Sequence, residues 1–107
     1  GEIDVAADGL RRALEDGIAA GARRLAVDLS RLTFLSTPAI DAVLAAFGRL
    51  AETGGQLAVV AGTDEIRRIF TITMLDRLFP VFAAQDEALA ELGVDETEAA
   101  VLQRANG

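Results

Sequence analysis

Hydrophobic residues along the chain switch between helical and strand-like spacing, and this switching predicts the elements of the fold. From Ala6 to Ala20 they recur every three or four positions, which predicts an amphipathic helix capped by Asp4 and ended by Gly21. The next helix ends at Gly54-Gly55 and has the clearest apolar stripe, which consists of Ile40, Val43, Leu44, Phe47, Leu50 and Ala51.

Two more helices are expected in the second half of the chain. Thr63 or Asp64 caps the first of them, and Ile66, Ile69 and Phe70 form its inward face. The second runs from Ala84 to Leu92. The tail beyond it, residues 94–107, also has a helical composition but few apolar residues, and we expect a helical extension or linker there.

Strands are predicted between these helices. Apolar residues alternate up to a strand end near Ser30 and run together from Gln56 to Ala61, and Pro80 to Ala83 forms a short edge strand. Gly1 to Val5 is typical of the tail of a strand, so we expect a strand before Gly1 to be missing or supplied by something else. Strands that alternate with helices predict an α/β fold with a largely parallel sheet.

The amino-acid composition excludes several kinds of functional site and partner. The 107 residues suit one domain, and they contain no His, Cys, Trp, Tyr or Lys, which excludes His/Cys metal sites, thiol nucleophiles and lysine chemistry. The net charge of −7 disfavours nucleic acid or an anionic membrane as a partner. The longest uncharged stretch, Thr53 to Thr63, is about half of a membrane-spanning helix. Lack of cysteine is typical of a protein in the reducing cytoplasm.

The segment from Leu32 to Ile40 joins a strand to the strongest helix. Pro38 suits the first helical position, so Thr37 is expected at the cap, facing the free N–H groups of the first turn. The helix dipole there favours a negative charge, so a phosphate on Thr37 is compatible with the fold. Two interpretations stay open: Thr37 is a modified residue or a simple cap. Ser36 has the same alternatives, with a role in a local turn favoured over a chemical one.

The run from Leu25 to Ile40 resembles the core signature of the STAS family, whose members include bacterial anti-sigma-factor antagonists. Supporting segments are Gly1-Glu2-Ile3-Asp4, Gly54-Gly55-Gln56-Leu57-Ala58-Val59-Val60 and Leu75-Asp76-Arg77-Leu78-Phe79-Pro80-Val81-Phe82. The resemblance implies a STAS-like domain over residues 1–93 that lacks the family's N-terminal strand. It also implies a mixed, mostly parallel sheet of about four strands with about four helices.

In that family an Asp-Ser-Ser/Thr-Gly-like motif opens the helix, and a partner kinase phosphorylates the residue after the Asp. The resemblance places Ser36 at the Asp position, Thr37 at the phosphoacceptor, Pro38 next and Ala39 at the Gly position. Ser36 thus removes a carboxylate beside the acceptor, and Ala39 narrows the backbone space available to a partner.

The expected partner face lies on the side of this helix opposite its apolar stripe. Three alanines there form a flat patch that loses no rotamer entropy on contact, although alanine is also simply a good helix former. Asp28, at the end of a strand near this segment, is expected either to hydrogen-bond the backbone of the segment or to face the acceptor. The residues expected to bind the partner are Ser36, Pro38, Ala39, Asp41, Ala42, Ala45 and Arg49; Ala46 and Glu52 complete the outward face.

The function implied by the resemblance is an anti-sigma-factor antagonist that binds an anti-sigma factor kinase and is released when Thr37 is phosphorylated. The chain then needs no cofactor, because ATP and Mg²⁺ belong to the kinase. The alternative is a non-phosphorylated scaffold or a cytoplasmic subunit of a signalling or transport complex. An enzyme requires two carboxylates that converge in a pocket, and no spacing indicates such a pair.

Overall fold

The computed structural model describes residues 5–30, 32, 34–93 and 100–103. These residues form four α-helices, four strands and one turn of 3₁₀ helix. In chain order they are α1 (Val5–Ala19), β1 (Arg24–Asp28), α2 (Thr37–Glu52), β2 (Gln56–Val60), α3 (Asp64–Ile72), η1 (Leu75–Arg77), β3 (Val81–Phe82), α4 (Gln85–Leu92) and β4 (Ala100–Gln103).

The four strands form one sheet in the order β3-β2-β1-β4, and every neighbouring pair is parallel. The two central strands are buried from their second residue onward, which explains why each is an almost continuous apolar run in the sequence. The short strand after Pro80 lies at an edge of the sheet, as predicted. The predicted α/β fold with a mostly parallel sheet is confirmed.

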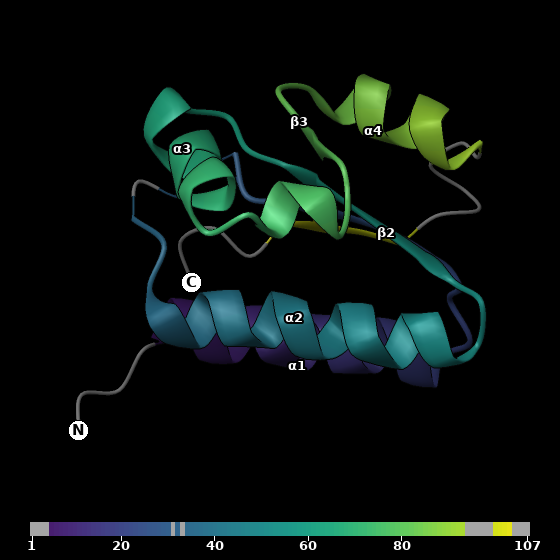
Figure 1. Cartoon of the computed structure of the whole chain (residues 1–107). Helices are drawn as coiled ribbons and strands as arrows, with labels where there is room; N and C mark the ends of the chain where they lie inside the picture. Colours follow the sequence, from purple (N-terminus) through teal and green to yellow (C-terminus); the bar gives the residue numbers. More distant parts are fainter. Residues whose placement is uncertain (1–4, 31, 33, 94–99, 104–107) are drawn as a thin grey trace.

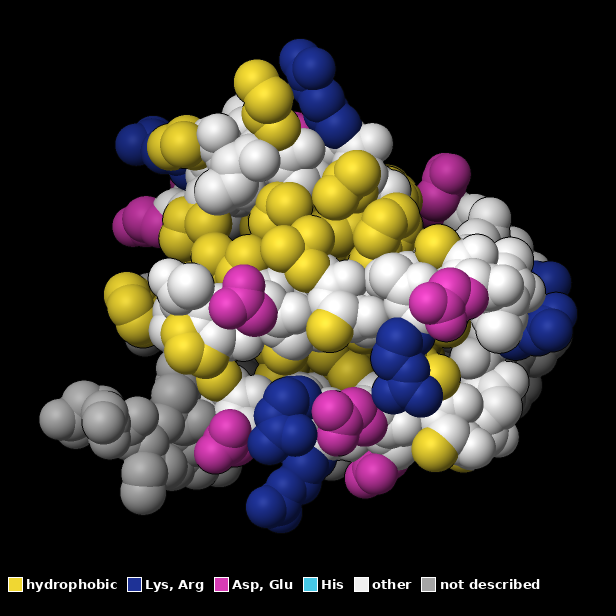
Figure 2. All heavy atoms as spheres, turned by 60° about the horizontal axis from the view of Figure 1, so that its bottom comes forward, with side chains coloured by type: hydrophobic (Ala, Val, Ile, Leu, Met, Phe, Trp, Pro, Cys, Tyr) yellow, Lys and Arg dark blue, Asp and Glu magenta, His cyan; other side chains and the backbone are white. Residues whose placement is uncertain are grey.

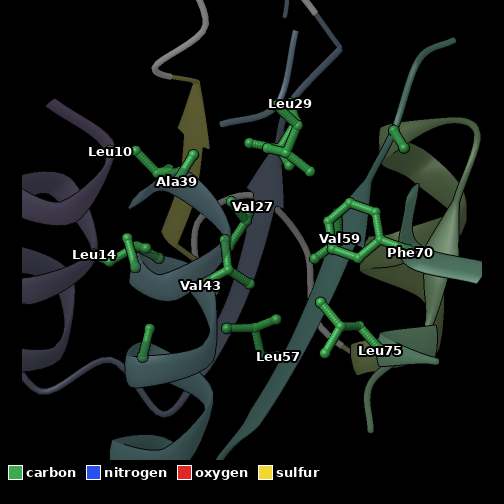
Figure 3. Packing of buried hydrophobic residues seen from close by; sticks show 14 of the residues in the cluster. Leu10, Leu14, Val27, Leu29, Ala39, Val43, Leu57, Val59, Phe70 and Leu75 are labelled. Carbon is green, nitrogen blue, oxygen red and sulfur yellow. The ribbon is translucent and has the colours of Figure 1, made fainter. Parts of the chain in front are cut away.

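Alternate residues of the central strands point to opposite faces of the sheet. Val27 and Val59 belong to the main hydrophobic cluster, where α1, α2, α3 and η1 cover one face (Figures 1 and 3). Ala26 and Ala58 point to the other face, which α4 covers. Because their small side chains allow close approach, one short helix suffices there. Three α-helices and η1 therefore share the first face, and the packing of α1 beside α2 shapes the candidate site.

Two predicted elements differ in the structure. Val5, expected in a strand, is the first described residue of α1, and the segment 100–103, expected in a helical tail, is β4. Parallel pairing with β1 satisfies backbone groups that would otherwise be unpaired at that edge, and this outweighs the helical composition of the tail. Asp4, the expected cap of α1, lies outside the described residues. Gly21, at φ 98°, follows the end of α1 as predicted.

Within the ranges given above, no helix combines the length and the apolar character needed to cross a membrane.

Candidate functional site

The segment between β1 and α2 is fixed by hydrogen bonds and by two buried leucines. Asp28 is buried at the end of β1, and its Oδ1 accepts a hydrogen bond from the Ser30 backbone N–H at 2.8 Å. Further along, Leu32 and Leu35 are buried in the main cluster. Asp28 therefore bonds the backbone of the segment, which is the structural one of its two expected roles.

The neighbouring loop packs directly against this segment. A Cβ added to Gly62, which follows β2, would lie 2.9 Å from the Ser30 Cβ and 3.0 Å from the Ser30 Cα and carbonyl oxygen. Real Cβ atoms are essentially never found under 3.0 Å, so this position requires glycine unless Ser30 moves. The two loops thus support one another at the carboxyl end of the sheet.

Ser36, and not Thr37, caps α2. The Ser36 hydroxyl oxygen accepts a hydrogen bond from the Ala39 backbone N–H at 3.3 Å, and its carbonyl accepts from Ile40 at 3.0 Å. The prediction that Pro38 is the first helical residue is therefore wrong by one position: Thr37 is first and Pro38 second. A proline is also tolerated at the second position, because the N–H that it lacks has no partner within the helix.

Thr37 is exposed at the start of α2. Within the described part of the chain its hydroxyl makes no hydrogen bond. Because Pro38 has no N–H and the Ala39 N–H is engaged by Ser36, the first turn offers fewer free donors than the sequence suggested. A group attached to the Thr37 oxygen would therefore point to solvent instead of being held by the helix.

Phe34 is an exposed aromatic residue on the same segment, and no pattern in the sequence predicted a role for it. It is 73% exposed, the highest value among the large hydrophobic residues described. It lies between the buried Leu32 and Leu35, so the packing of its neighbours holds this part of the segment in place. The signal available in the sequence was the position of Phe34, two residues before Ser36, which caps α2.

A groove of about 350 Å³ runs between α1 and α2 and begins at Pro38. Asp41, Ala45 and Arg49, all expected to face a partner, are exposed and line it. Its lining from α1 includes Asp8, Arg11, Leu14, Glu15 and Ile18. Figure 2 shows the charged side chains of both helices on either side of this groove, with hydrophobic side chains between them.

The expected outward face of α2 is partly wrong. Ala39, Ala42 and Ala46 are buried in the main cluster, while Ala51, expected in the core, is exposed. The cause is α1, which packs along the alanine side of α2 and covers it. Three residues of the expected inward stripe are consequently only half-buried, at the opposite flank of the helix: Ile40, Leu44 and Phe47.

The charges along the groove differ in how they are paired. Arg11 forms ion pairs with Asp8 at 3.6 Å and with Glu15 at 3.5 Å, both along α1. Asp41 and Arg49 form no ion pair with any other described residue, so both are available to a partner. The described residues contain no cluster of three or more acidic side chains that could hold a metal ion.

The comparisons with known proteins agree with this geometry. The STAS domain model matches residues 1–88. Over 70 residues the chain is 30% identical to a protein of Bordetella bronchiseptica whose name is "Putative anti-sigma factor antagonist BtrV", and this match spans 65% of the chain and 60% of that relative. The crystal structure of an anti-sigma factor antagonist from Mycobacterium paratuberculosis has 32% identity and a TM-score of 0.75, covering 87% of this chain and 80% of that one. The NMR structure of the protein TM1081 shares the fold, with a TM-score of 0.70 at 16% identity over 89% of this chain and 79% of that one.

Because the STAS domain model covers most of the length of this chain, the chain belongs to the STAS domain family.

Proposed function

We propose that the chain is an anti-sigma factor antagonist of the bacterial cytoplasm, a regulatory binding module and not an enzyme. In its unphosphorylated form it binds an anti-sigma factor that is also a serine/threonine kinase, which leaves the sigma factor free for transcription. The Thr37 oxygen then attacks the γ-phosphorus of the Mg²⁺-bound ATP held by the kinase. The bond from this phosphorus to the bridging oxygen breaks, ADP leaves, the hydroxyl proton passes to the kinase or to water, and the complex dissociates. Two of the relatives reported above are named anti-sigma factor antagonists.

The observation that carries this proposal is the position of Thr37. Its side chain is exposed at the start of α2, and the cap of the helix is made by Ser36 instead. The resemblance to the family motif is what assigns the phosphoacceptor to this position. A kinase can therefore approach the Thr37 hydroxyl without first breaking a helix cap. The exposed Pro38 and the groove lined by Asp41, Ala45 and Arg49 give the partner a surface beside it.

The proposed release of the kinase follows from the negative charge that phosphorylation adds to Thr37. A phosphate adds about −1.5 to −2 units of charge at pH 7. Asp41 lies one helical turn after Thr37 and is exposed, so the two negative groups would lie side by side on α2. Any nucleotide in the kinase would meet both negative groups across the interface. The usual scale of such coupling is roughly a 5- to 150-fold change in affinity.

The test begins by recovering the anti-sigma factor with the chain from native lysate and purifying it. The purified kinase and ATP are then expected to modify Thr37, as mapped by mass spectrometry, and Thr37→Glu is expected to bind the kinase more weakly than the parent chain. Thr37→Val is the control, because it keeps the shape of the side chain but lacks the hydroxyl; it should bind like the parent and stay unmodified. An unmodified Thr37, together with full-strength binding by Thr37→Glu, would contradict the switch.

That contradicting result would favour the second candidate, a STAS scaffold that works without phosphorylation. The replacement of the family's Asp and Gly by Ser36 and Ala39 is the feature that supports it. A scaffold would bind its partner with the same affinity whether residue 37 is Thr, Val or Glu.

A further inference from the structure

The exposed face of α2 carries two charged residues of opposite sign. Asp41 and Arg49 are both exposed, and neither forms an ion pair with another described residue. The charges that line the same groove from α1 are already paired with one another, because Arg11 forms ion pairs with Asp8 and with Glu15. Since α2 lies beside α1 at one side of the molecule (Figure 1), the two charges of α2 are accessible to a second chain.

These two charges are placed symmetrically about Ala45. Asp41 lies four residues before Ala45 and Arg49 lies four residues after it, so the three residues follow one line along the helix. Each charged residue is about 6 Å from Ala45 along the helix axis, because an α-helix rises about 1.5 Å per residue. All three residues are exposed and line the groove beside α1. We call Asp41, Ala45 and Arg49 the charged row.

The charged row is complementary to a second copy of itself. If two copies of α2 lie antiparallel with Ala45 against Ala45, Asp41 of each copy faces Arg49 of the other copy. The two-fold axis through this contact generates the ion pair twice, so all four charges of the two rows are matched. The short side chain of Ala45 allows the helix axes to approach to the roughly 8–10 Å that is usual for packed helices.

The charges of α2 also disfavour the other alignments of two copies. A parallel contact would place Asp41 against Asp41 and Arg49 against Arg49, and like charges repel each other. An antiparallel contact shifted by three residues, close to one helical turn, would place Asp41 against Glu52, which is acidic and exposed. The opposite shift would leave both charges of the row unmatched. In the alignment about Ala45, Glu52 faces the uncharged Pro38. The charges therefore select one orientation and one register.

The contact between two copies is expected to be weak. Each chain has a net charge of −7, so two copies repel one another as a whole. Salt screens this repulsion beyond about 8 Å at physiological ionic strength, whereas the two ion pairs act at contact distance. A single pair of helices also buries less surface than a permanent dimer requires. We therefore expect monomers in exchange with dimers.

We propose that the chain forms a weak antiparallel dimer through α2, with the charged row as its contact. This inference goes beyond the proposed function, and only its link to phosphorylation rests on that function. Thr37 lies four residues before Asp41, so the same alignment places it against Thr53 of the other copy, where α2 ends. The dimer thus covers Thr37, and the kinase has to bind the monomer. A negative charge on residue 37 would face Glu52 and the negative end of the helix dipole, which weakens the dimer.

Sedimentation velocity of the purified chain, in a concentration series to about 1 mM, measures the dimer directly. The mass of the parent chain is expected to rise from that of one chain toward that of two. Asp41→Arg and Arg49→Asp each place like charges against one another, so each variant alone should have a dissociation constant about tenfold higher or more. When the two variants are mixed in equal amounts, they should associate like the parent, because each copy supplies the charge that the other lacks. The mixed dimer also has the same total charge as the parent dimer.

Asp16→Arg and Arg12→Asp are the matched controls, because they make the same two changes in net charge at exposed positions of α1 that do not line the groove. Both controls should dimerise like the parent, and circular dichroism should show all variants folded. Thr37→Glu should raise the dissociation constant of the dimer, and Thr37→Val should leave it unchanged.

A parent chain that stays monomeric to about 1 mM would overturn the inference. Controls that dissociate as much as the variants of the charged row would overturn it too, because they would indicate a general effect of charge. A mixture of Asp41→Arg and Arg49→Asp that fails to associate, or a Thr37→Glu chain that dimerises as tightly as the parent, would contradict the register. None of these measurements includes a kinase, so a failure here leaves the proposed function standing.

Discussion

The Ser36 hydroxyl oxygen and the Ala39 backbone N–H are joined by a hydrogen bond of 3.3 Å that closes the first turn of α2. From the sequence, the helix cap and the possible phosphorylation were both expected at Thr37. Ser36 stabilises the helix, and Thr37, the next residue, is exposed. Modification of Thr37 can therefore change the surface without removing the cap.

Removing the Ser36 hydroxyl should lower the free energy of unfolding, whereas removing the Thr37 hydroxyl should not. Ser36→Ala is expected to lower the free energy of unfolding by about 0.5–2 kcal/mol, because the Ala39 N–H loses its partner. Thr37→Ala, its matched control, should change the free energy of unfolding by less than about 0.5 kcal/mol. Urea unfolding followed by circular dichroism measures both. An equal loss in the two variants would show that Thr37 contributes to the cap.

Asp28 is expected to hold the segment before α2 through its bond to the Ser30 N–H. Asp28→Ala should lower the free energy of unfolding by about 1–3 kcal/mol, because it removes a buried acceptor and leaves a donor unpaired. Asp28→Asn keeps an acceptor oxygen of the same shape and should lose less. Hydrogen exchange of the Ser30 amide should accelerate in the Ala variant. An unchanged exchange rate would contradict this role for Asp28.

The contact between Gly62 and Ser30 leads to a prediction about the same segment. Gly62→Ala should lower the free energy of unfolding by about 1–3 kcal/mol, because its Cβ would force the Ser30 backbone to move. Gly48→Ala is the matched control: Gly48 is exposed within α2, and an added Cβ would meet nothing within 4 Å. It should raise the free energy of unfolding by about 0.5–1 kcal/mol through helix propensity. Thermal unfolding distinguishes the signs, and a stabilised Gly62→Ala would show that Ser30 moves freely.

The elements with a strong local pattern were predictable. α2, α3 and α4 start and end within a few residues of their predicted bounds, because caps, glycines and apolar spacing act locally. β4 was missed, since its strand conformation depends on pairing with β1, about seventy-five residues earlier in the chain. A non-local pairing leaves no periodic signal in four residues.

The error at the candidate site has a different origin. The spacing of α2 shows which side chains are large and apolar, but not which neighbouring helix will cover its alanines. α1 packs closely against Ala42 and Ala46 because small side chains let helices approach, and this turns Leu44 and Phe47 toward the opposite flank. The position of Thr37 at the start of α2 was predictable from the sequence to within one residue; the burial of the alanines under α1 was not.

The last prediction concerns Ala45 and Ala46, two adjacent alanines of α2 that differ in burial. Ala46 is buried in the cluster that includes Leu10 and Leu14 of α1, so Ala46→Leu should overpack it and lower the free energy of unfolding by about 1–3 kcal/mol. Ala45 is exposed in the groove between the two helices, so Ala45→Leu should change the free energy of unfolding by less than about 0.5 kcal/mol. If a partner uses this groove, the same Ala45→Leu variant should bind the anti-sigma factor more weakly, because the larger side chain fills the space. Urea unfolding and calorimetric titration measure the two effects separately. Equal stability of the two variants would contradict the close packing of α1 on α2, and unchanged affinity of Ala45→Leu would remove the groove from the partner surface.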